Sequence, residues 1–167
     1  KARWFGNVVR KGHKWVAWSG EPQSRAPGEA ARFGTHVKKV SGGYLIDGTK
    51  VFSTSAGSAQ WAILLVNMAG PGGIRHAQGS LEDQILLACD LSDPSVSFDG
   101  SWWDPIGMRA TVSHLTRFQQ TFIPNKQVIG YPGQYLQEGW QTCFIPHYGA
   151  SFLGAAEAAF DFALEYL

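Results

Sequence analysis

Short apolar runs interrupted by turn residues fill most of the chain and predict a β domain. The runs are rich in Val, Ile, Phe, Trp and Thr, and Gly, Pro, Asp and Ser separate them. They lie at residues 13–19, 35–40, 44–46, 50–54, 61–67, 84–90 and 113–123. Many short strands at this spacing predict a barrel or a sandwich. The pair Asp47-Gly48 predicts a hairpin, because a type I′ turn needs two residues that tolerate positive φ.

The pattern changes after Pro146, where apolar residues recur at helical spacing and Ala is frequent. These features predict a long helix from residue 147 to 167. Its apolar stripe is wider than a short barrel needs as a cover. Two interpretations stay open: the helix folds back onto the barrel, or it begins a helical domain. Because Lys1 is no initiator and neither Gly nor Pro ends the helix, we expect a piece of a longer protein.

Composition and charge limit the size, the partners and the compartment. With 167 residues and 44% hydrophobic residues, the chain can form one domain that buries about 70% of its unfolded surface. A formal charge of +1 argues against nucleic acid as a partner. We expect a cytoplasmic protein with no membrane partner, because the chain lacks a run of ~20 apolar residues and a secretory signal. Cys89 and Cys143 are far apart and show no CxxC spacing, which argues against a disulfide framework or a zinc site.

Four sequence blocks resemble the acyl-CoA dehydrogenase family, and they stand in the family's order. The longest is GYLIDGTKVFSTSAGSAQW at 43–61, which resembles "GYxLNGxKxWIT(N/S)GxxAD". The others are SGEP at 19–22, similar to the "TEP" turn, WDPIGMRAT at 103–111, similar to "WxxLGMRAT", and FIPNKQVIG at 122–130, similar to "VFVPxxxVLG". The resemblance implies a mainly β fold: a flavin-facing middle β-barrel at 1–130, followed at 131–167 by a connection and the first helix of a C-terminal helical domain. It also implies FAD as cofactor (alternatively FMN), an acyl-CoA or another small molecule as substrate, and a homo-oligomer.

The resemblance places the cofactor contacts in two segments. A flavin ring presents acceptors at O2, O4 and N5, a donor at N3 and two flat faces, so its site needs fixed polar groups beside an apolar wall. Phe52, Ser53 and Thr54 supply this mixture, with the Thr54 hydroxyl and amide facing N5 and O4 and with Phe52 in the place of the usual Trp. The second segment is Trp18, Ser19 and Gly20. Gly20 stands where the family has a Thr donor, and either Ser19 or the backbone is expected to replace it. The stretch 23–29 lacks the "GxGSD" pattern, which leaves the contacts to CoA open.

Three functions follow from these observations as hypotheses. The first is α,β-dehydrogenation of an acyl-CoA thioester, for which the resemblance implies a glutamate base beyond Leu167; neither Glu157 nor Glu165 matches its motif. The second, favoured by the change at Gly20 and by the altered CoA loop, is a reduced-flavin-dependent monooxygenase of the same fold. The third is a non-catalytic interaction module. The histidines show no metal-ligand spacing, and Ser113-His114 is the one pair whose strand approaches the substrate in some flavin monooxygenases of this fold.

Overall fold

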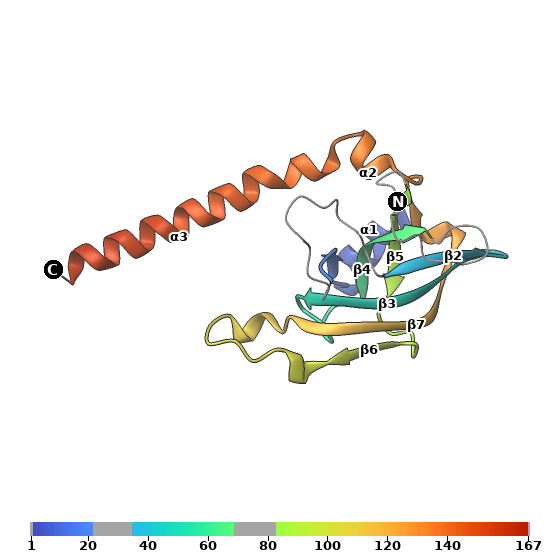
Figure 1. The fold of residues 1–167 in the computed structure, drawn as a ribbon, viewed down its shortest axis with the longest axis horizontal. Coiled ribbons are helices and arrows are strands. Elements are labelled where there is room, and N and C mark those ends of the chain that lie inside the picture. The colour runs from blue at the N-terminus through green and yellow to red at the C-terminus, as the bar shows by residue number, and fades with distance from the viewer. Residues whose placement is uncertain (1, 22–34, 69–82, 167) are drawn as a thin grey trace. The chain divides into compact units, whose positions relative to one another are not determined.

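The computed structural model describes residues 2–21, 35–68 and 83–166 (Figure 1). The chain divides into two units, residues 1–134 and 135–167, and each is described by itself. The first unit contains a helix, α1 (Ala2–Lys11), and eight strands. The strands are β1 (Trp15–Trp18), β2 (His36–Val40), β3 (Gly43–Ser53), β4 (Trp61–Met68), β5 (Gln84–Asp90), β6 (Val96–Asp99), β7 (His114–Pro124) and β8 (Val128–Ile129).

The strands form one sheet in the order β6-β7-β3-β2-β4-β5-β8, with β1 beside β4. Most neighbours are antiparallel, whereas the β1–β4 and β2–β4 pairs are parallel. Among the described residues, no strand pairing joins β6 to β8, so the hydrogen bonds do not close the sheet into the predicted barrel. The predicted fold class, mainly β with a long C-terminal helix, is confirmed.

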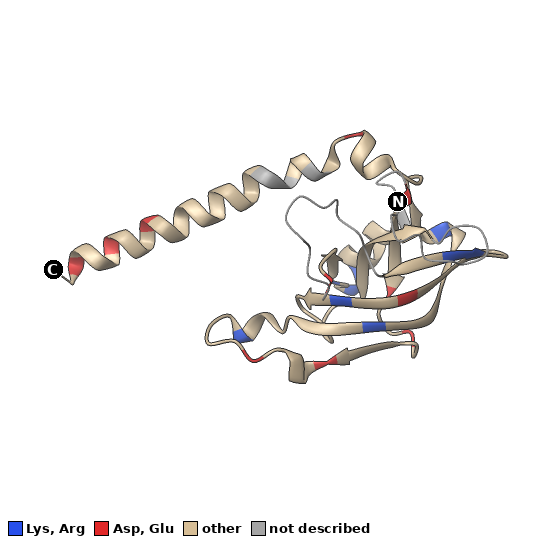
Figure 2. Ribbon diagram, viewed as in Figure 1, with Lys and Arg blue, Asp and Glu red and all other residues tan. Residues whose placement is uncertain are grey.

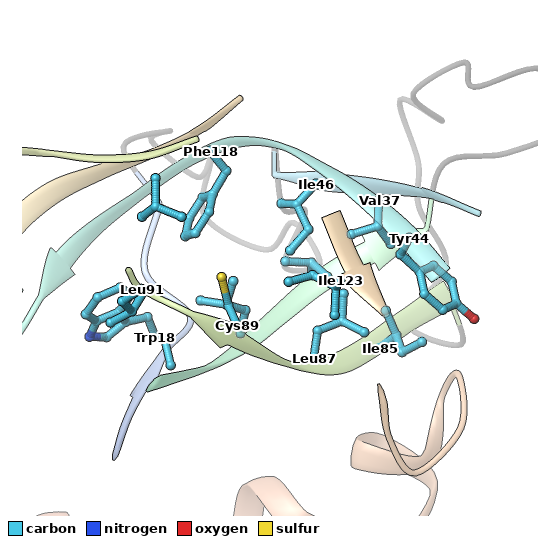
Figure 3. Packing of buried hydrophobic residues seen from close by; sticks show 14 of the residues in the cluster. Trp18, Val37, Tyr44, Ile46, Ile85, Leu87, Cys89, Leu91, Phe118 and Ile123 are labelled. Atoms are coloured by element: carbon cyan, nitrogen blue, oxygen red, sulfur yellow. The ribbon is translucent and has the colours of Figure 1, made fainter. Parts of the chain in front are cut away.

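The core lies between the curved parts of this sheet. Figure 3 shows its side chains, which come from strands that are far apart in the sequence. Val37 from β2, Ile46 from β3 and Leu87 from β5 are completely buried. Trp18, at the end of β1, belongs to the same cluster and is 3% exposed. The core therefore fixes the residue from which the segment 18–21 leaves the sheet.

The predicted hairpin at Asp47-Gly48 is wrong, because β3 runs straight through these two residues. The real hairpin joins β2 to β3, with Val40 opposite Gly43. Gly48 instead lies at a shift in the pairing of β3 with β7. Its φ is 142°, and a Cβ built on it would lie 2.5 Å from Thr35 Cα. The glycine is thus explained by a bulge and a close backbone approach, not by a turn.

One helix and two strands of the first unit were not predicted. The helix α1 ends in Arg10 and Lys11 just before Gly12, a typical C-terminal signal, and the Gly12 N–H donates to the Val8 carbonyl over 3.1 Å. The strands β6 and β8 have only 4 and 2 residues, too few to show an alternating pattern. The stretch 23–29, where the sequence lacks the family's CoA pattern, lies outside the described residues, as do residues 70–81, whose Gly-Pro-rich sequence predicts an exposed excursion.

The second unit consists of helical segments. A short helix, α2 (Gln134–Gln137), stands at the boundary and is followed by a 3₁₀ turn (Trp140–Phe144) and by α3 (Ile145–Glu165). The predicted long helix is confirmed and starts two residues earlier than expected. Its exposed large apolar side chains are Tyr148, Phe152, Leu153, Phe160, Phe162 and Leu164, and the exposed Tyr166 directly follows the helix. None of the described helices is long and apolar enough to cross a membrane.

Candidate functional site

The two segments predicted to face a flavin lie side by side. The Val51 N–H donates to the Gly20 carbonyl over 3.0 Å. The indole N–H of Trp18 donates to the Thr54 carbonyl over 3.1 Å. Because these bonds cross between residues more than 30 positions apart, the segment 18–21 is attached along the end of β3. The structure therefore brings the two predicted halves of the site together.

A buried ion pair strengthens this attachment. The side chain of Lys50 is fully buried and that of Glu21 is 6% exposed, and Nζ lies 2.6 Å from Glu21 Oε1. Lys50 Nζ also donates to the Leu65 carbonyl over 2.7 Å and to the Ser19 carbonyl over 3.3 Å. The Glu21 carboxylate accepts the Thr35 N–H at 3.2 Å. Lys50 thus holds the segment 18–21, β3 and β4 at one point.

Burial governs the protonation of Lys50. Removal from water lowers the pKa of this ammonium group from 10.5 to about 8, although the charge of Glu21 and its hydrogen bond act in the opposite direction. Lys50 is therefore mainly charged at neutral pH. A charged lysine at this depth is tolerated because carboxylate and carbonyl oxygens surround it.

Gly20 leaves no room for a side chain. A Cβ at this position would lie 2.8 Å from the Val51 carbonyl oxygen. The Thr that the family carries here would need a shift of the backbone, so only main-chain groups of Gly20 can serve a ligand. The neighbouring Ser19 is exposed, and its hydroxyl makes no hydrogen bond to any described residue.

Phe52 points outward because the strand bulges. The pairing of β3 with β7 shifts between Lys50 and Ser53, and Phe52 adopts a φ of 54°. A left-handed conformation is unfavourable for an aromatic residue, and it leaves the ring 61% exposed. The ring meets Trp102 edge to face, with centroids 4.9 Å apart, and Trp103 with centroids 6.2 Å apart. The bulge thus builds an aromatic surface beside Thr54.

Ser53 and Thr54 have different environments. Ser53 is completely buried, and its hydroxyl has no partner among the described residues. Thr54 is exposed, and its N–H already donates to the Phe52 carbonyl over 2.8 Å. The hydroxyl of Thr54, and not its amide, is therefore the group available to a ligand.

The Thr54 hydroxyl is backed by residues of a second loop. Ser113 Oγ lies 3.0 Å from Thr54 Oγ1, and Thr111 Oγ1 lies 2.8 Å from Ser113 Oγ. The Thr111 carbonyl accepts the Ser55 N–H over 2.9 Å, which ties the two loops together. The imidazole ring of His114 lies beside Gly100, since a Cβ built on Gly100 would be 3.1 Å from this ring. The Ser113-His114 pair thus contributes its serine to this site.

Backbone strain is concentrated at the same place. In the described part of the chain, five residues other than glycine have positive φ. Four of them flank the junction of the two loops, namely Phe52, Ser55, Met108 and Val112 with φ of 54°, 64°, 58° and 48°. Such strained conformations cluster at ligand sites, where the surrounding structure holds them in place.

Sequence reasoning missed Lys50, Glu21 and Thr111 as parts of the site, and it singled out Ser113 only together with His114, as a pair near the substrate. Lys50 follows Asp47, Gly48 and Thr49 and opens the predicted strand 50–54, which also holds Ser53 and Thr54, so the local sequence gives no sign that its side chain is buried. Nothing in the sequence pairs Thr111 and Ser113 with Thr54. No group of three or more His, Cys, Asp or Glu residues in the described ranges could hold a metal ion.

The comparisons with known proteins agree with this architecture. No family profile matches the chain. The chain is 25% identical over 152 residues to the "Putative acyl-CoA dehydrogenase YdbM" of Bacillus subtilis, a match that covers 87% of this chain and 35% of that protein. The acyl-CoA dehydrogenase structure from Geobacillus kaustophilus matches with a TM-score of 0.66 and 19% identity, over 81% of this chain and 34% of that one. TdsC from Paenibacillus sp. A11-2, solved with FMN and indole, matches with a TM-score of 0.66 and 22% identity, over 81% and 31%.

These matches define the class of the domain: its fold is that of the middle domain of acyl-CoA dehydrogenases. The predicted resemblance to the acyl-CoA dehydrogenase family is confirmed by the sequence match as well. The chain spans about a third of the length of the relatives that it matches, at 35% and 34% of the first two.

Proposed function

We propose that this chain forms the wall that contacts the reactive edge of a flavin in an acyl-CoA dehydrogenase-like oxidoreductase. The observation that carries the proposal is the pairing of an exposed aromatic ring, Phe52, with the exposed hydroxyl of Thr54 on a strained bulge. Both lie where the two predicted cofactor segments are joined by hydrogen bonds. The cofactor is FAD or FMN.

The chemistry of the side chains at this site suits a flavin ring. The ring needs a flat apolar surface and a few polar groups at its edge. Phe52, supported by Trp102, supplies the surface, and the Thr54 hydroxyl supplies a hydrogen bond. Ser19 and the main chain of Gly20 supply polar groups on the other segment. Trp18 is buried and joins the two segments through its hydrogen bond to the Thr54 carbonyl, and Ser53 is buried, so neither presents an exposed side chain to a ligand.

When bound, a flavin supplies a hydride acceptor at N5. The chain's own residues position the flavin and do not react with it. Thr54 orients the edge of the ring, and the ion pair between Lys50 and Glu21 keeps the segment 18–21 attached to β3. Dehydrogenation of an acyl-CoA also needs a base for the α-proton. We place this base after residue 167. The charged residues of α3 are all acidic, namely Glu157, Asp161 and Glu165 (Figure 2), and none lies in the motif expected for the base.

One observation favours a second candidate, a reduced-flavin-dependent monooxygenase of the same fold. Gly20 cannot carry the hydroxyl side chain of the dehydrogenase pattern without a clash with the Val51 carbonyl. TdsC, which shares the fold, was solved with indole, a heteroaromatic molecule, beside FMN.

The two candidates are separated by anaerobic stopped-flow absorbance of the flavin in a full-length parent mixed with acyl-CoA. A dehydrogenase bleaches the oxidised flavin, and Thr54→Val slows this step roughly ten- to hundredfold, because a lost hydrogen bond to a buried partner costs about 1–3 kcal/mol. Ser58→Ala, a change at an exposed hydroxyl that bonds only the Ser55 carbonyl, is the control. Absence of bleaching by any acyl-CoA supports the monooxygenase, and unchanged kinetics in Thr54→Val removes Thr54 from the site.

A further inference from the structure

Three hydroxyl groups form a continuous hydrogen-bonded chain behind the exposed end of Thr54. Ser113 Oγ is the middle member, 3.0 Å from Thr54 Oγ1 and 2.8 Å from Thr111 Oγ1. Thr111 Oγ1 lies 2.9 Å from the Met108 carbonyl oxygen and donates to it. Ser113 is only 4% exposed, so the chain leads from the surface into the loop.

This chain of hydroxyls can run in two directions, since each hydroxyl has one hydrogen to donate and two lone pairs. In the inward direction, Thr54 donates to Ser113, Ser113 to Thr111, and Thr111 to the Met108 carbonyl. Thr54 then offers only lone pairs to a ligand. In the outward direction, Thr111 donates to Ser113 and Ser113 to Thr54, and the Thr54 O–H points at the ligand.

Reversal leaves no buried group without a partner. In the outward direction the Met108 carbonyl loses the hydroxyl of Thr111 but keeps its N–H, which donates over 3.1 Å. No heavy atom has to move, because only the hydroxyl hydrogens rotate. The two directions therefore differ by one neutral hydrogen bond within the protein, and a ligand hydrogen bond of similar strength selects between them.

We propose that this hydroxyl chain allows Thr54 to form a hydrogen bond with flavin N5 in both oxidation states. The oxidised ring has an unprotonated N5, which accepts, and the reduced ring has an N5–H, which donates. The outward direction serves the first and the inward direction serves the second. The inference rests on the proposed function. It makes Ser113 and Thr111 positioning residues, which act through Thr54 and do not touch the flavin.

Loss of Ser113 is expected to affect one oxidation state more than the other. In Ser113→Ala, the Thr54 hydroxyl still donates to oxidised flavin. When the Thr54 hydroxyl accepts a hydrogen bond from reduced flavin, it can donate its own hydrogen only to the Phe52 carbonyl. The Phe52 oxygen lies 3.5 Å from Thr54 Oγ1, which is too long for a good hydrogen bond. Binding of the reduced form should weaken about fivefold more than binding of the oxidised form, as expected for one neutral hydrogen bond.

The test is anaerobic equilibrium dialysis of the 167-residue chain against FMN, once oxidised and once reduced with dithionite. The readout is the ratio of the two dissociation constants, reduced over oxidised. Ser113→Ala raises this ratio about fivefold, Thr111→Val raises it in the same direction, and Ser113→Thr, which keeps the hydroxyl, leaves it unchanged. Ser58→Ala leaves the ratio unchanged, and circular dichroism checks that each variant is folded.

The outcomes separate the inference from the proposed function. If Ser113→Ala weakens the binding of oxidised and reduced FMN equally, or weakens neither, the hydroxyl chain does not reverse with the oxidation state, and the proposed flavin binding is not contradicted. If the unchanged chain binds neither form at millimolar FMN, the proposed function fails and the inference fails with it. In Thr54→Val the further change Ser113→Ala should no longer alter the ratio, and a persisting effect would show that Ser113 acts by another route.

Discussion

Replacement of Lys50 by Met should detach the segment 18–21 from the sheet. The change removes the donor for the carbonyls of Leu65 and Ser19, and it removes the positive charge that lies 2.6 Å from the Glu21 carboxylate, which is 6% exposed. Breaking one side of a buried ion pair typically costs about 3–5 kcal/mol. Since a domain of this size is stable by roughly 5–15 kcal/mol, the loss should be large but survivable.

The assay is chemical denaturation followed by tryptophan fluorescence, together with thermal unfolding. Lys50→Met should lower Tm by on the order of 10 °C. The double variant Lys50→Met with Glu21→Gln should regain about 1–2 kcal/mol, because it removes the buried negative charge that faced Lys50 and keeps an acceptor for the Thr35 N–H. Lys38→Met is the matched control, since Lys38 is an exposed lysine of β2 and its loss should stay within about 0.5 kcal/mol.

The result that would refute this reasoning is a loss below about 1 kcal/mol for Lys50→Met. It would mean that the ion pair contributes no more than a surface pair. A double variant less stable than Lys50→Met would contradict the charge argument in particular, because it would show that Glu21 is stabilising even without the lysine.

Three further predictions concern other parts of the chain. Burial lowers the pKa of Lys50 to about 8, so from about pH 8 upward the unfolded chain binds more protons at Lys50 than the folded chain does. Burial raises the pKa of Cys89 to about 12, so from about pH 9 upward the unfolded chain binds fewer protons at Cys89 than the folded chain does. Denaturation at pH 8 and 9 should therefore show a rising free energy of unfolding that Lys50→Met abolishes, and a flat profile would contradict the pKa of Lys50. Phe52→Gly should keep or raise stability, by up to about 1 kcal/mol from relief of the left-handed strain, while FMN binding weakens; a clear loss of stability would argue against strain at this bulge. The exposed apolar side chains of α3 should drive self-association, which sedimentation measures; a monomer at high concentration would favour a helix that packs onto its own chain.

The sequence predicted the fold class and proposed two segments for the candidate site, but it did not predict how the side chains of these segments are oriented. Simple alternation along β3 places Lys50, Phe52 and Thr54 on one exposed face. The bulge breaks that alternation, so that Lys50 and Val51 are both buried and only Phe52 and Thr54 point outward. A bulge depends on how β7 pairs with β3, and a local pattern does not contain that information.

The same limit explains the error at Asp47-Gly48 and the missed hydroxyl chain. Asp-Gly is a strong hairpin signal, yet here Asp47 accepts the Gln120 N–H from β7 over 2.9 Å and Gly48 accommodates Thr35. The contact between Thr54 and Ser113 joins residues 59 positions apart. Tertiary contacts of this kind override local preference, and a local sequence pattern does not reveal which distant residues form them.

The most direct test of the flavin-facing wall is a nitrogen–proton NMR titration of the 167-residue chain with FMN. We expect the chain to purify colourless and to bind FMN weakly, because a single wall supplies few of the contacts that a flavin needs. The signals predicted to move are the amides of 19–20 and 52–54 and the indole N–H of Trp18, which bonds the Thr54 carbonyl. Thr54→Val should reduce these shifts at equal FMN, and Ser58→Ala should not. Shifts confined to other strands, or no shift at millimolar FMN, would contradict the account.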